Sequence, residues 1–197
     1  MAMQYDVWSI RPSSNDAYFR AAAAIGSAGA LTLLQSEVAK YGCGYQISIT
    51  SNGDDSGLTF TIVGIKVGAL DGQTTTETVT GPNAGVVNST NYYSDIISIS
   101  VSGTSVNNVK IGYGGNLAFP RCRIKSVYYV GAANAGTITF TSYAANSVIL
   151  SIPTVGSATY AMTVYIPPEG ILTTKATVDD YAVMTLSQVT NLTVFCG

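Results

Sequence analysis

Apolar and polar residues alternate with a period of two along most of the chain from Tyr45 onward. The segment YQISIT (45–50) puts a tyrosine and two isoleucines on one face, and LTFTIVGIKV (58–67) puts leucine, phenylalanine and isoleucine opposite threonines. This alternation is typical of strands with one buried face. The intervening SNGDDSG (51–57) is rich in residues that tolerate the backbone angles of tight turns, so the pattern predicts a β-hairpin.

The same pattern recurs on both sides of a glycine-rich segment, GYGGNLAFP (112–120). Strand-like segments at intervals of roughly 8–12 residues are typical of β-sandwiches and β-barrels. The glycines and the proline suit a connection between compact units. We therefore predict an all-β fold with two consecutive β-sandwich or barrel units, residues 21–115 and residues 116–197.

The first 20 residues are predicted to form an extended N-terminal arm. They contain Trp8, Tyr18 and Phe19, and aromatic side chains in a terminal segment commonly act as anchors. The arm would either pack on the protein's own body as a first strand or lie across a neighbouring subunit. Residues 16–40 alone have some helical character, but glycines interrupt it, so a helix of about two turns or none is expected. The LTLL segment (31–34) could instead form a strand.

Ionised side chains are unusually scarce. Charged residues make up 10% of the sequence and hydrophobic residues 47%, against an ordinary charged fraction of about 25%. From Gly131 to Thr174 the one charged residue is Glu169. Because a monomer in water normally keeps soluble through interspersed charges, this deficit predicts that much of the surface, above all in the second unit, is covered by other subunits.

The net charge and the length of the apolar segment argue against nucleic acid and membranes as partners. A net charge of −2 and a pI near 4.8 lack the basic footprint of nucleic-acid-binding proteins, so nucleic acid is not expected as a partner. The apolar segment AAAAIGSAGALTLL (21–34) is shorter than the roughly 20 residues that cross a bilayer, so no membrane association is expected. Asp6, Pro12 and Asp16 precede it where a signal peptide would have a short basic region.

The sequence lacks the residues of common catalytic and metal sites. Histidine is absent, which removes the usual acid and base at neutral pH and the commonest metal ligand. The three cysteines, Cys43, Cys122 and Cys196, are odd in number and show no CxxC spacing, so neither a disulfide framework nor a zinc site is indicated. We expect no enzyme activity, no catalytic residues, no cofactor and no metal.

Carboxylates occur in two adjacent pairs, Asp54 with Asp55 and Asp179 with Asp180, and singly at Glu77. Neighbouring side chains on an extended backbone point in opposite directions, and the acidic loop pattern of a calcium site is missing, so both pairs are interpreted as turn residues. Glu77 lies among threonines in TTTETVTG and is interpreted as part of a solvated strand face.

Three of the nine basic residues, Arg121, Arg123 and Lys125, fall within five positions. Alternation would place all three on one face of a strand. They could contact phosphate or an acidic partner, but three charges without interleaved stacking residues make only a modest patch. We favour a salt-bridged interface between subunits or domains, and include these residues with Trp8, Tyr18 and Phe19 as expected interface residues.

Several motifs together resemble a module of small virion proteins of tailed bacteriophages. They are ITSNGDDSGLTFTIVG (49–64), the stretch TETVTGPNAG…KIGYG (76–114) and the ending YIPPEGILTTK…NLTVFCG (165–197). The resemblance covers residues 46–115 well, residues 120–197 loosely and the first 45 hardly at all. The chain departs from the pattern in NYYSD, where a basic residue commonly precedes the aromatic, and in a longer hairpin between Gly64 and Gln73.

The resemblance implies a structural protein of the virion, made in the host bacterial cytoplasm. The expected role is a head decoration or cement protein on the capsid surface, with the major capsid protein and further copies of itself, as a dimer or trimer, as partners. A tail, adaptor or head-fibre component is the first alternative. A carbohydrate-binding module that stacks sugars on exposed tyrosines is the second.

Overall fold

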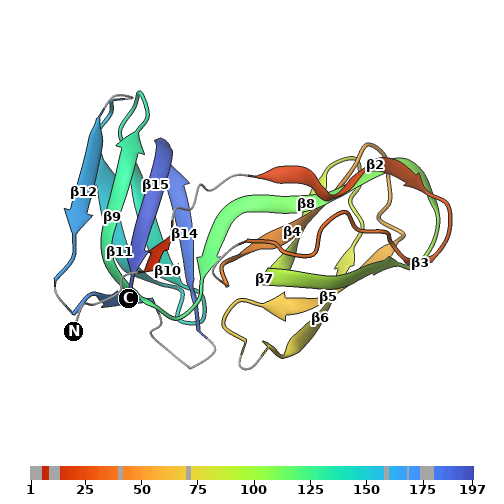
Figure 1. The fold of residues 1–197 in the computed structure, drawn as a ribbon. Coiled ribbons are helices and arrows are strands. Elements are labelled where there is room, and N and C mark those ends of the chain that lie inside the picture. Colours follow the sequence, from red (N-terminus) through yellow and green to blue (C-terminus); the bar gives the residue numbers. More distant parts are fainter. Residues whose placement is uncertain are drawn as a thin grey trace. The chain divides into compact units, whose positions relative to one another are not determined.

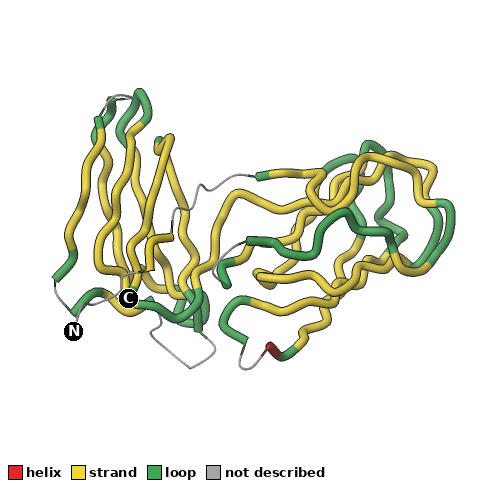
Figure 2. Tube along the Cα trace, in the orientation of Figure 1, coloured by secondary structure: helices red, strands yellow, loops and turns green. Residues whose placement is uncertain are grey.

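The computed structural model describes residues 14–39, 42–69, 72–157, 160–167, 169–173 and 180–197, together with the backbone of residues 6–8. Strands account for 67% of the described residues and helix for 1%, which confirms the all-β class (Figure 2). The chain divides into two compact units. We call residues 13–115 the N-terminal unit, and residues 1–12 with 116–197 the C-terminal unit.

The boundary between the units falls inside a strand rather than in a flexible connection. β8 (Ser105–Phe119) runs through most of the glycine-rich segment that the sequence analysis interpreted as a linker. Its first part pairs with β2 of the N-terminal unit, and its last three residues pair with β14 of the C-terminal unit. Glycine is permitted in a strand where another backbone approaches closely, so the segment keeps its pairing despite its composition.

The expected arm of residues 1–20 is divided between the two units. β1 (Asp6–Trp8) pairs antiparallel with β15 in the C-terminal unit, whereas β2 (Asn15–Ile25) pairs with β8 in the N-terminal unit. The described parts of this segment are therefore strands of the chain's own sheets. For these described residues, the pairing agrees with the first alternative, a strand that packs on the protein's own body.

The N-terminal unit is a twisted antiparallel sheet with strand order β8-β4-β7-β5-β6 (Figure 1). β2 is added on β8 and β3 on β7. The long strand β7 pairs with β4 through its first half and with β5 through its second half, with irregularities in both registers. The remaining strands of this unit are β3 (Gly29–Ala30), β4 (Gly44–Ser51), β5 (Thr59–Lys66), β6 (Thr74–Thr80) and β7 (Val86–Val101).

Burial follows the period of two that the sequence shows. Along β5, Phe60, Ile62 and Gly64 are buried while the residues between them are half-buried. Each fully buried aliphatic or aromatic side chain contributes roughly 1.5–3 kcal/mol relative to exposure. The side chains that form this core come from all the long strands of the unit: Phe19, Ile47, Ile49, Phe60, Ile62, Tyr93, Ile96, Ile99 and Ile111.

No helix forms in the described part of residues 16–40. The alanine-rich segment is the irregular strand β2, whose register with β8 shifts three times. Residues 31–38, including LTLL, form no strand but run beside β7, where the amides of Leu31 and Val38 donate to the carbonyls of Ile99 and Ser94. Tertiary pairing with a long neighbouring strand thus overrides the helix propensity of alanine.

The C-terminal unit contains two groups of paired strands. One has the order β1-β15-β9-β12, with β13 also on β9, and the other has the order β11-β10-β14 followed by the end of β8. Both bury apolar residues, and Phe119 meets Phe140 edge to face with ring centroids 5.6 Å apart. The strands are β9 (Arg123–Gly131), β10 (Gly136–Ser142), β11 (Ser147–Thr154), β12 (Ala161–Tyr165), β13 (Ile171–Leu172), β14 (Ala182–Ser187) and β15 (Val189–Cys196).

Candidate functional site

The first candidate is the aspartate pair of the 51–57 hairpin loop, whose two members have different environments. Asp55 is buried, with 4% of its surface exposed. Its carboxylate accepts hydrogen bonds from Ser51 Oγ at 2.5 Å, Ser105 Oγ at 2.6 Å and Asn107 Nδ2 at 3.1 Å. Burial alone would raise the pKa of Asp55, but the hydrogen bonds from Ser105, Ser51 and Asn107 outweigh it and lower the pKa.

The backbone of Asp55 also joins a third loop. Its amide donates to the carbonyl of Pro82 at 2.8 Å, and the amide of Leu58 donates to its carbonyl at 2.9 Å. Gly81 lies so close that a Cβ there would overlap the Asp55 carbonyl oxygen. The loops that carry SNGDDSG, TGPNAG and GTSVNN therefore meet around one buried carboxylate, which we call the Asp55 cluster. The most distinctive motif residues of the sequence hold the fold together here.

Asp54, by contrast, is a turn residue as the sequence analysis predicted. Its carboxylate accepts hydrogen bonds from the amide of Ser56 at 3.0 Å and from Ser56 Oγ at 2.7 Å. These bonds lower the pKa of Asp54. The two carboxylates point to different partners and do not converge on a shared site.

The second aspartate pair follows a related plan in the C-terminal unit. Asp180 is buried and accepts hydrogen bonds from Ser142 Oγ at 2.7 Å and from the amide of Ala144 at 2.9 Å. Ser142 Oγ in turn accepts from the amide of Ala145 at 3.0 Å. Asp180 therefore fixes the turn between β10 and β11, while Asp179 lies outside the described residues.

Glu77 is not part of a solvated strand face, which corrects the sequence interpretation. Its half-buried carboxylate on β6 accepts hydrogen bonds from the amides of Thr90 and Asn91, from Asn91 Nδ2 at 2.8 Å and from the Tyr93 hydroxyl at 3.2 Å. Burial, together with the negative charge of Glu77, raises the pKa of Tyr93. The Glu77 carboxylate thus accepts hydrogen bonds from the backbone amides of Thr90 and Asn91, which lie where the register between β4 and β7 is irregular.

The irregularity that Glu77 holds lies in the NSTNYY segment of β7. The register between β4 and β7 shifts between Gln46 and Ser48. Ser89 Oγ accepts a hydrogen bond from the amide of Ile47 at 2.8 Å and donates to the carbonyl of Asn91 at 2.7 Å. A serine hydroxyl therefore replaces a backbone acceptor across the bulge, which explains why hydroxyl and amide side chains cluster there.

Among the described residues, the carboxylates do not gather into a cluster that could hold a metal ion. No group of three or more cysteine, aspartate or glutamate side chains within the described ranges could hold a metal ion. In the same part of the chain, no helix is long and apolar enough to cross a bilayer. The carboxylates described above are satisfied by serine, asparagine, tyrosine or backbone donors and serve structural roles.

The basic cluster lies at the start of β9. Arg121 is exposed just before the strand, Arg123 is exposed on it and Lys125 is half-buried. Arg123 Nη1 donates to the carbonyl of Glu169 at 3.1 Å, and the amide of Ile166 donates to the carbonyl of Lys125 at 3.0 Å. The cluster therefore supports the YIPPEGI turn of its own unit. The salt-bridged interface expected for these residues stays a prediction.

The aromatic residues expected in an arm divide between core and surface. Phe19 is fully buried and meets Tyr18 edge to face with ring centroids 5.0 Å apart. Tyr18 also contacts Tyr113, which stacks on Tyr45 at 4.6 Å. Phe19 is thus a core residue of the N-terminal unit and is not available to a neighbouring subunit, whereas Tyr18 is half-buried. The side chain of Trp8 lies outside the described residues.

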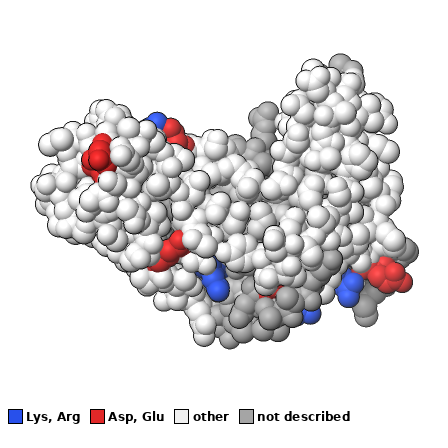
Figure 3. Space-filling model, turned by 180° about the vertical axis from the view of Figure 1, so that it is seen from behind, with Lys and Arg blue, Asp and Glu red and all other residues white. Residues whose placement is uncertain are grey.

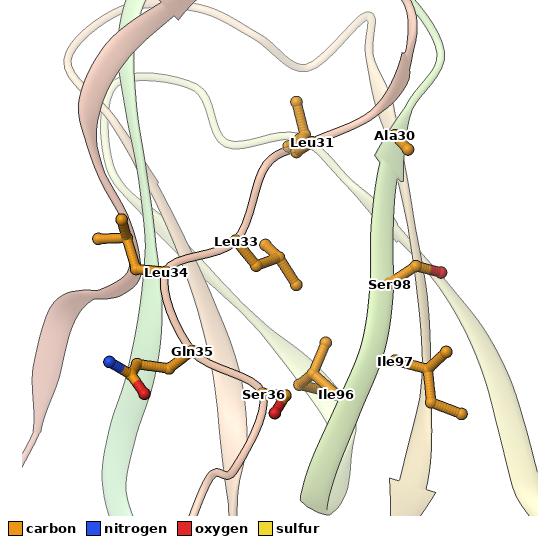
Figure 4. A pocket seen from close by; sticks show the side chains of 9 residues that line it. All are labelled: Ala30, Leu31, Leu33, Leu34, Gln35, Ser36, Ile96, Ile97 and Ser98. Atoms are coloured by element: carbon orange, nitrogen blue, oxygen red, sulfur yellow. The ribbon is translucent and has the colours of Figure 1, made fainter.

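An open hollow lined by both apolar and polar residues occurs on the N-terminal unit, between residues 30–36 and β7 (Figure 4). It has a volume of about 500 Å³ and none of its lining residues is titratable. Leu34 and Ile97, at its border, are 63% and 57% exposed. The exposed aliphatic side chains at this border can contact an apolar partner.

Uncharged residues dominate the visible surface (Figure 3). The charged atoms in that view are a few separate spots on an otherwise uncharged face. Exposed large apolar side chains occur in both units, and their exposed fractions range from 40% for Tyr143 and Tyr160 to 93% for Val106. An ion pair joins Lys110 and Asp16 within the N-terminal unit.

Two of the three cysteines meet in the C-terminal unit. Cys122 Sγ and Cys196 Sγ lie 2.8 Å apart. The buried Thr173 fixes this corner, since its Oγ1 accepts from the amide of Cys122 at 2.9 Å. Nothing in the spacing of the cysteines along the sequence indicates this contact, because it depends on the pairing of β9 with β15.

Comparisons with protein-family models, curated proteins and solved structures found no match. The functional interpretation therefore depends on the residues themselves. The features with a clear geometry are a set of internally satisfied carboxylates and a surface that is apolar and poor in charge. The satisfied carboxylates explain the sequence motifs, and the charge-poor surface concerns what the protein contacts.

Proposed function

We propose that this chain is a structural protein of a tailed-bacteriophage particle and acts as a decoration protein on the head. In this role it binds the outer face of the capsid lattice in many copies, bridges neighbouring major-capsid subunits and opposes expansion of the shell under internal DNA pressure. The sequence resemblance to small virion proteins suggests the class of particle. The all-β fold suits a load-bearing role that needs no moving parts.

The observation that carries this proposal is the combination of scarce charge with exposed apolar side chains. Only 10% of the residues are charged, and Asp55, Asp180 and Glu77 are committed to internal hydrogen bonds. Large apolar patches on a soluble chain generally mark surfaces that another molecule covers. A protein that is tiled beside its own copies on a shell has such surfaces covered in its working state.

The energetics favour many modest contacts. Burial of apolar surface gains roughly 25 cal/mol per Å², and association costs consume much of that gain for a single contact. Repetition over a lattice adds avidity, because each attached copy holds its neighbours at high effective concentration. A decoration protein therefore needs no deep pocket or charged hot spot, and the exposed aliphatic side chains of Leu34 and Ile97 beside the hollow are adequate for docking.

The test is binding to particles, followed by location of the bound protein. Purified protein is mixed with capsids that lack it, the particles are sedimented, and cryo-electron microscopy gives position and copy number. Many symmetric copies on the head are expected. Binding at the tail would replace the decoration role with a tail or adaptor role, and failure to co-sediment with any particle would refute a virion role.

A surface variant identifies the contact within this experiment. Leu34→Ser with Ile97→Ser removes the exposed aliphatic border of the hollow, and Val106→Ser removes an exposed aliphatic residue elsewhere on the same unit. The double variant is expected to lose particle binding while the control retains it. Deletion of residues 1–20 is not a suitable test, because it would remove Phe19 from the core.

A further inference from the structure

The strand β12 lies at the edge of its sheet. Among the residues that the structure describes, β12 pairs with β9 and with no other strand. The amide of Gly131 donates to the carbonyl of Tyr160, and the amide of Ile166 donates to that of Lys125, both at 3.0 Å. In an antiparallel ladder, successive residues direct their backbone N–H and C=O groups alternately toward and away from the neighbouring strand, and these two bonds show which residues face β9. Even-numbered residues of β12 therefore direct their backbone groups toward β9, and Ala161, Thr163 and Tyr165 direct theirs away from it.

Edges of this kind normally carry a feature that prevents pairing with another chain. The strand β11, at the edge of the other group of strands in this unit, has two such features. Pro153 lacks an amide hydrogen, and the register with β10 shifts so that Ile149 has no partner residue. β12 has neither a proline nor a bulge, and it carries no charged residue. Of these two edges, β12 is the one left open to a further strand.

The side chains along β12 favour a second copy of the same chain as the occupant. Tyr165 is 83% exposed, and Met162 and Tyr160 are about 40% exposed. In antiparallel pairing about a two-fold axis, β12 lies beside β12 of the second copy, which runs in the opposite direction. A charged residue near the axis would therefore lie close to the same charge on the other copy. The uncharged sequence YAMTVYI (160–166) avoids this repulsion, and its flanking segment contains Glu169 alone as a charged residue between 131 and 173.

We infer that β12 of one copy pairs antiparallel with β12 of a second copy, with the two-fold axis at Thr163. This register centres the two strands on each other and uses all three outward residues, because it pairs Thr163 with Thr163 and Ala161 with Tyr165, whose outward backbone groups have no partner among the described residues. The β1-β15-β9-β12 sheet then continues from one copy into the next. This inference rests on the self-assembly included in the proposed function and specifies the surface and symmetry of that assembly.

The test measures mass in solution as a function of concentration. Analytical ultracentrifugation of the unmodified protein is expected to show a monomer that doubles in mass as concentration rises. Thr163→Lys places two like charges opposite each other at the axis and is expected to abolish the dimer. Val106→Lys adds the same charge at a 93% exposed site of the other unit and is expected to leave the dimer unchanged. A Thr163→Lys protein that still dimerises, or an unmodified protein that stays monomeric, would overturn the inference.

Two further measurements test the register and separate this inference from the virion role. Thr163→Cys, oxidised with oxygen and copper–phenanthroline, is expected to form a disulfide-linked dimer, whereas Val155→Cys on the segment after β11 is not. Hydrogen exchange at Ala161, Thr163 and Tyr165 is expected to slow as concentration rises, which needs no variant. A monomeric Thr163→Lys protein that still binds capsids supports both proposals, and a dimer that ignores capsids supports the pairing alone.

Discussion

Replacement of Asp55 by alanine is the most direct test of how the motif residues act. Asp55 joins the hairpin loop 51–57 to Ser105 and Asn107 on β8, about fifty positions later in the chain. The substitution removes three hydrogen bonds to a buried carboxylate and leaves the donors of Ser51, Ser105 and Asn107 without their acceptor. If the hydroxyls are partly satisfied by water, the loss is about 3 kcal/mol in the free energy of unfolding of the N-terminal unit.

Hydrogen exchange measured by mass spectrometry is the suitable assay, because it resolves the two units separately. A loss of about 3 kcal/mol corresponds to exchange roughly 100-fold faster at the slowest amides of the N-terminal unit. Amides of β9 and β15 in the C-terminal unit are the internal reference. Asp54→Ala is the matched control, because Asp54 is exposed and bonds only within its own turn, so its effect is expected to be much smaller.

The pH dependence tests the ionised form of Asp55. Its pKa in the folded protein lies below the ordinary value near 3.9. The carboxylate therefore contributes stability that is fully present above pH 4 and is lost as the pH falls through the folded-state pKa. The difference between the unmodified protein and Asp55→Asn should be larger at pH 7 than at pH 2.5. Equal exchange in the Asp54 and Asp55 variants, or a difference that grows at low pH, would refute this account of the cluster.

Three further predictions follow from other contacts. Gly81→Ala forces a Cβ against the Asp55 carbonyl oxygen and should cost about 1–3 kcal/mol in thermal or chemical unfolding, whereas Gly85→Ala in the same loop has space and should be nearly neutral. Glu77→Gln should weaken the bonds that hold the bulge of β7 and cost about 1–2 kcal/mol, detected as faster exchange of residues 88–93; unchanged exchange there would contradict this role. Mild oxidation with diamide should join Cys122 to Cys196, so non-reducing peptide mapping that recovers both as free thiols would contradict the observed contact.

The period of two was sufficient to predict the class of fold and many of the strands. Segments such as LTFTIVGIKV form strands because their alternating residues fill a core on one side. The N-terminal region was harder to interpret, because AAAAI has high helix propensity and only its pairing with β8 makes it a strand. The glycine-rich segment was predicted to connect two units, and the units do divide within it, between Gly115 and Asn116, although most of it is part of strand β8. Gly112 lies on strand β8, and because glycine has no Cβ, the backbone of Asn15 can approach it closely.

The contacts around the carboxylates could not be read from local spacing. Asp55 and Ser105 are adjacent only because β4, β5 and β8 bring their ends together, and sequence distance conceals that. Phe19 illustrates the opposite error, since an aromatic residue near the terminus suggested an anchor for a neighbour and proved to be core. A signal was available in both cases. Glycines in and beside strands mark places where another backbone approaches closely, and Gly81 against Asp55 is such a place; Phe19 occupies the buried face of β2.

The C-terminal unit consists of two segments that are far apart in the sequence, so the ribosome makes them at different times. This unit includes residues 1–12 as well as residues 116–197, and among the described strands β1 pairs with β15. The ribosome delivers residues 13–115 between these two parts, so the N-terminal unit can fold while the strand that precedes it still waits. A nascent chain halted once β8 has left the ribosome, but before β15 is made, should therefore already protect the amides of β5 and β7 from exchange, yet leave Asp6–Trp8 accessible until β15 has emerged.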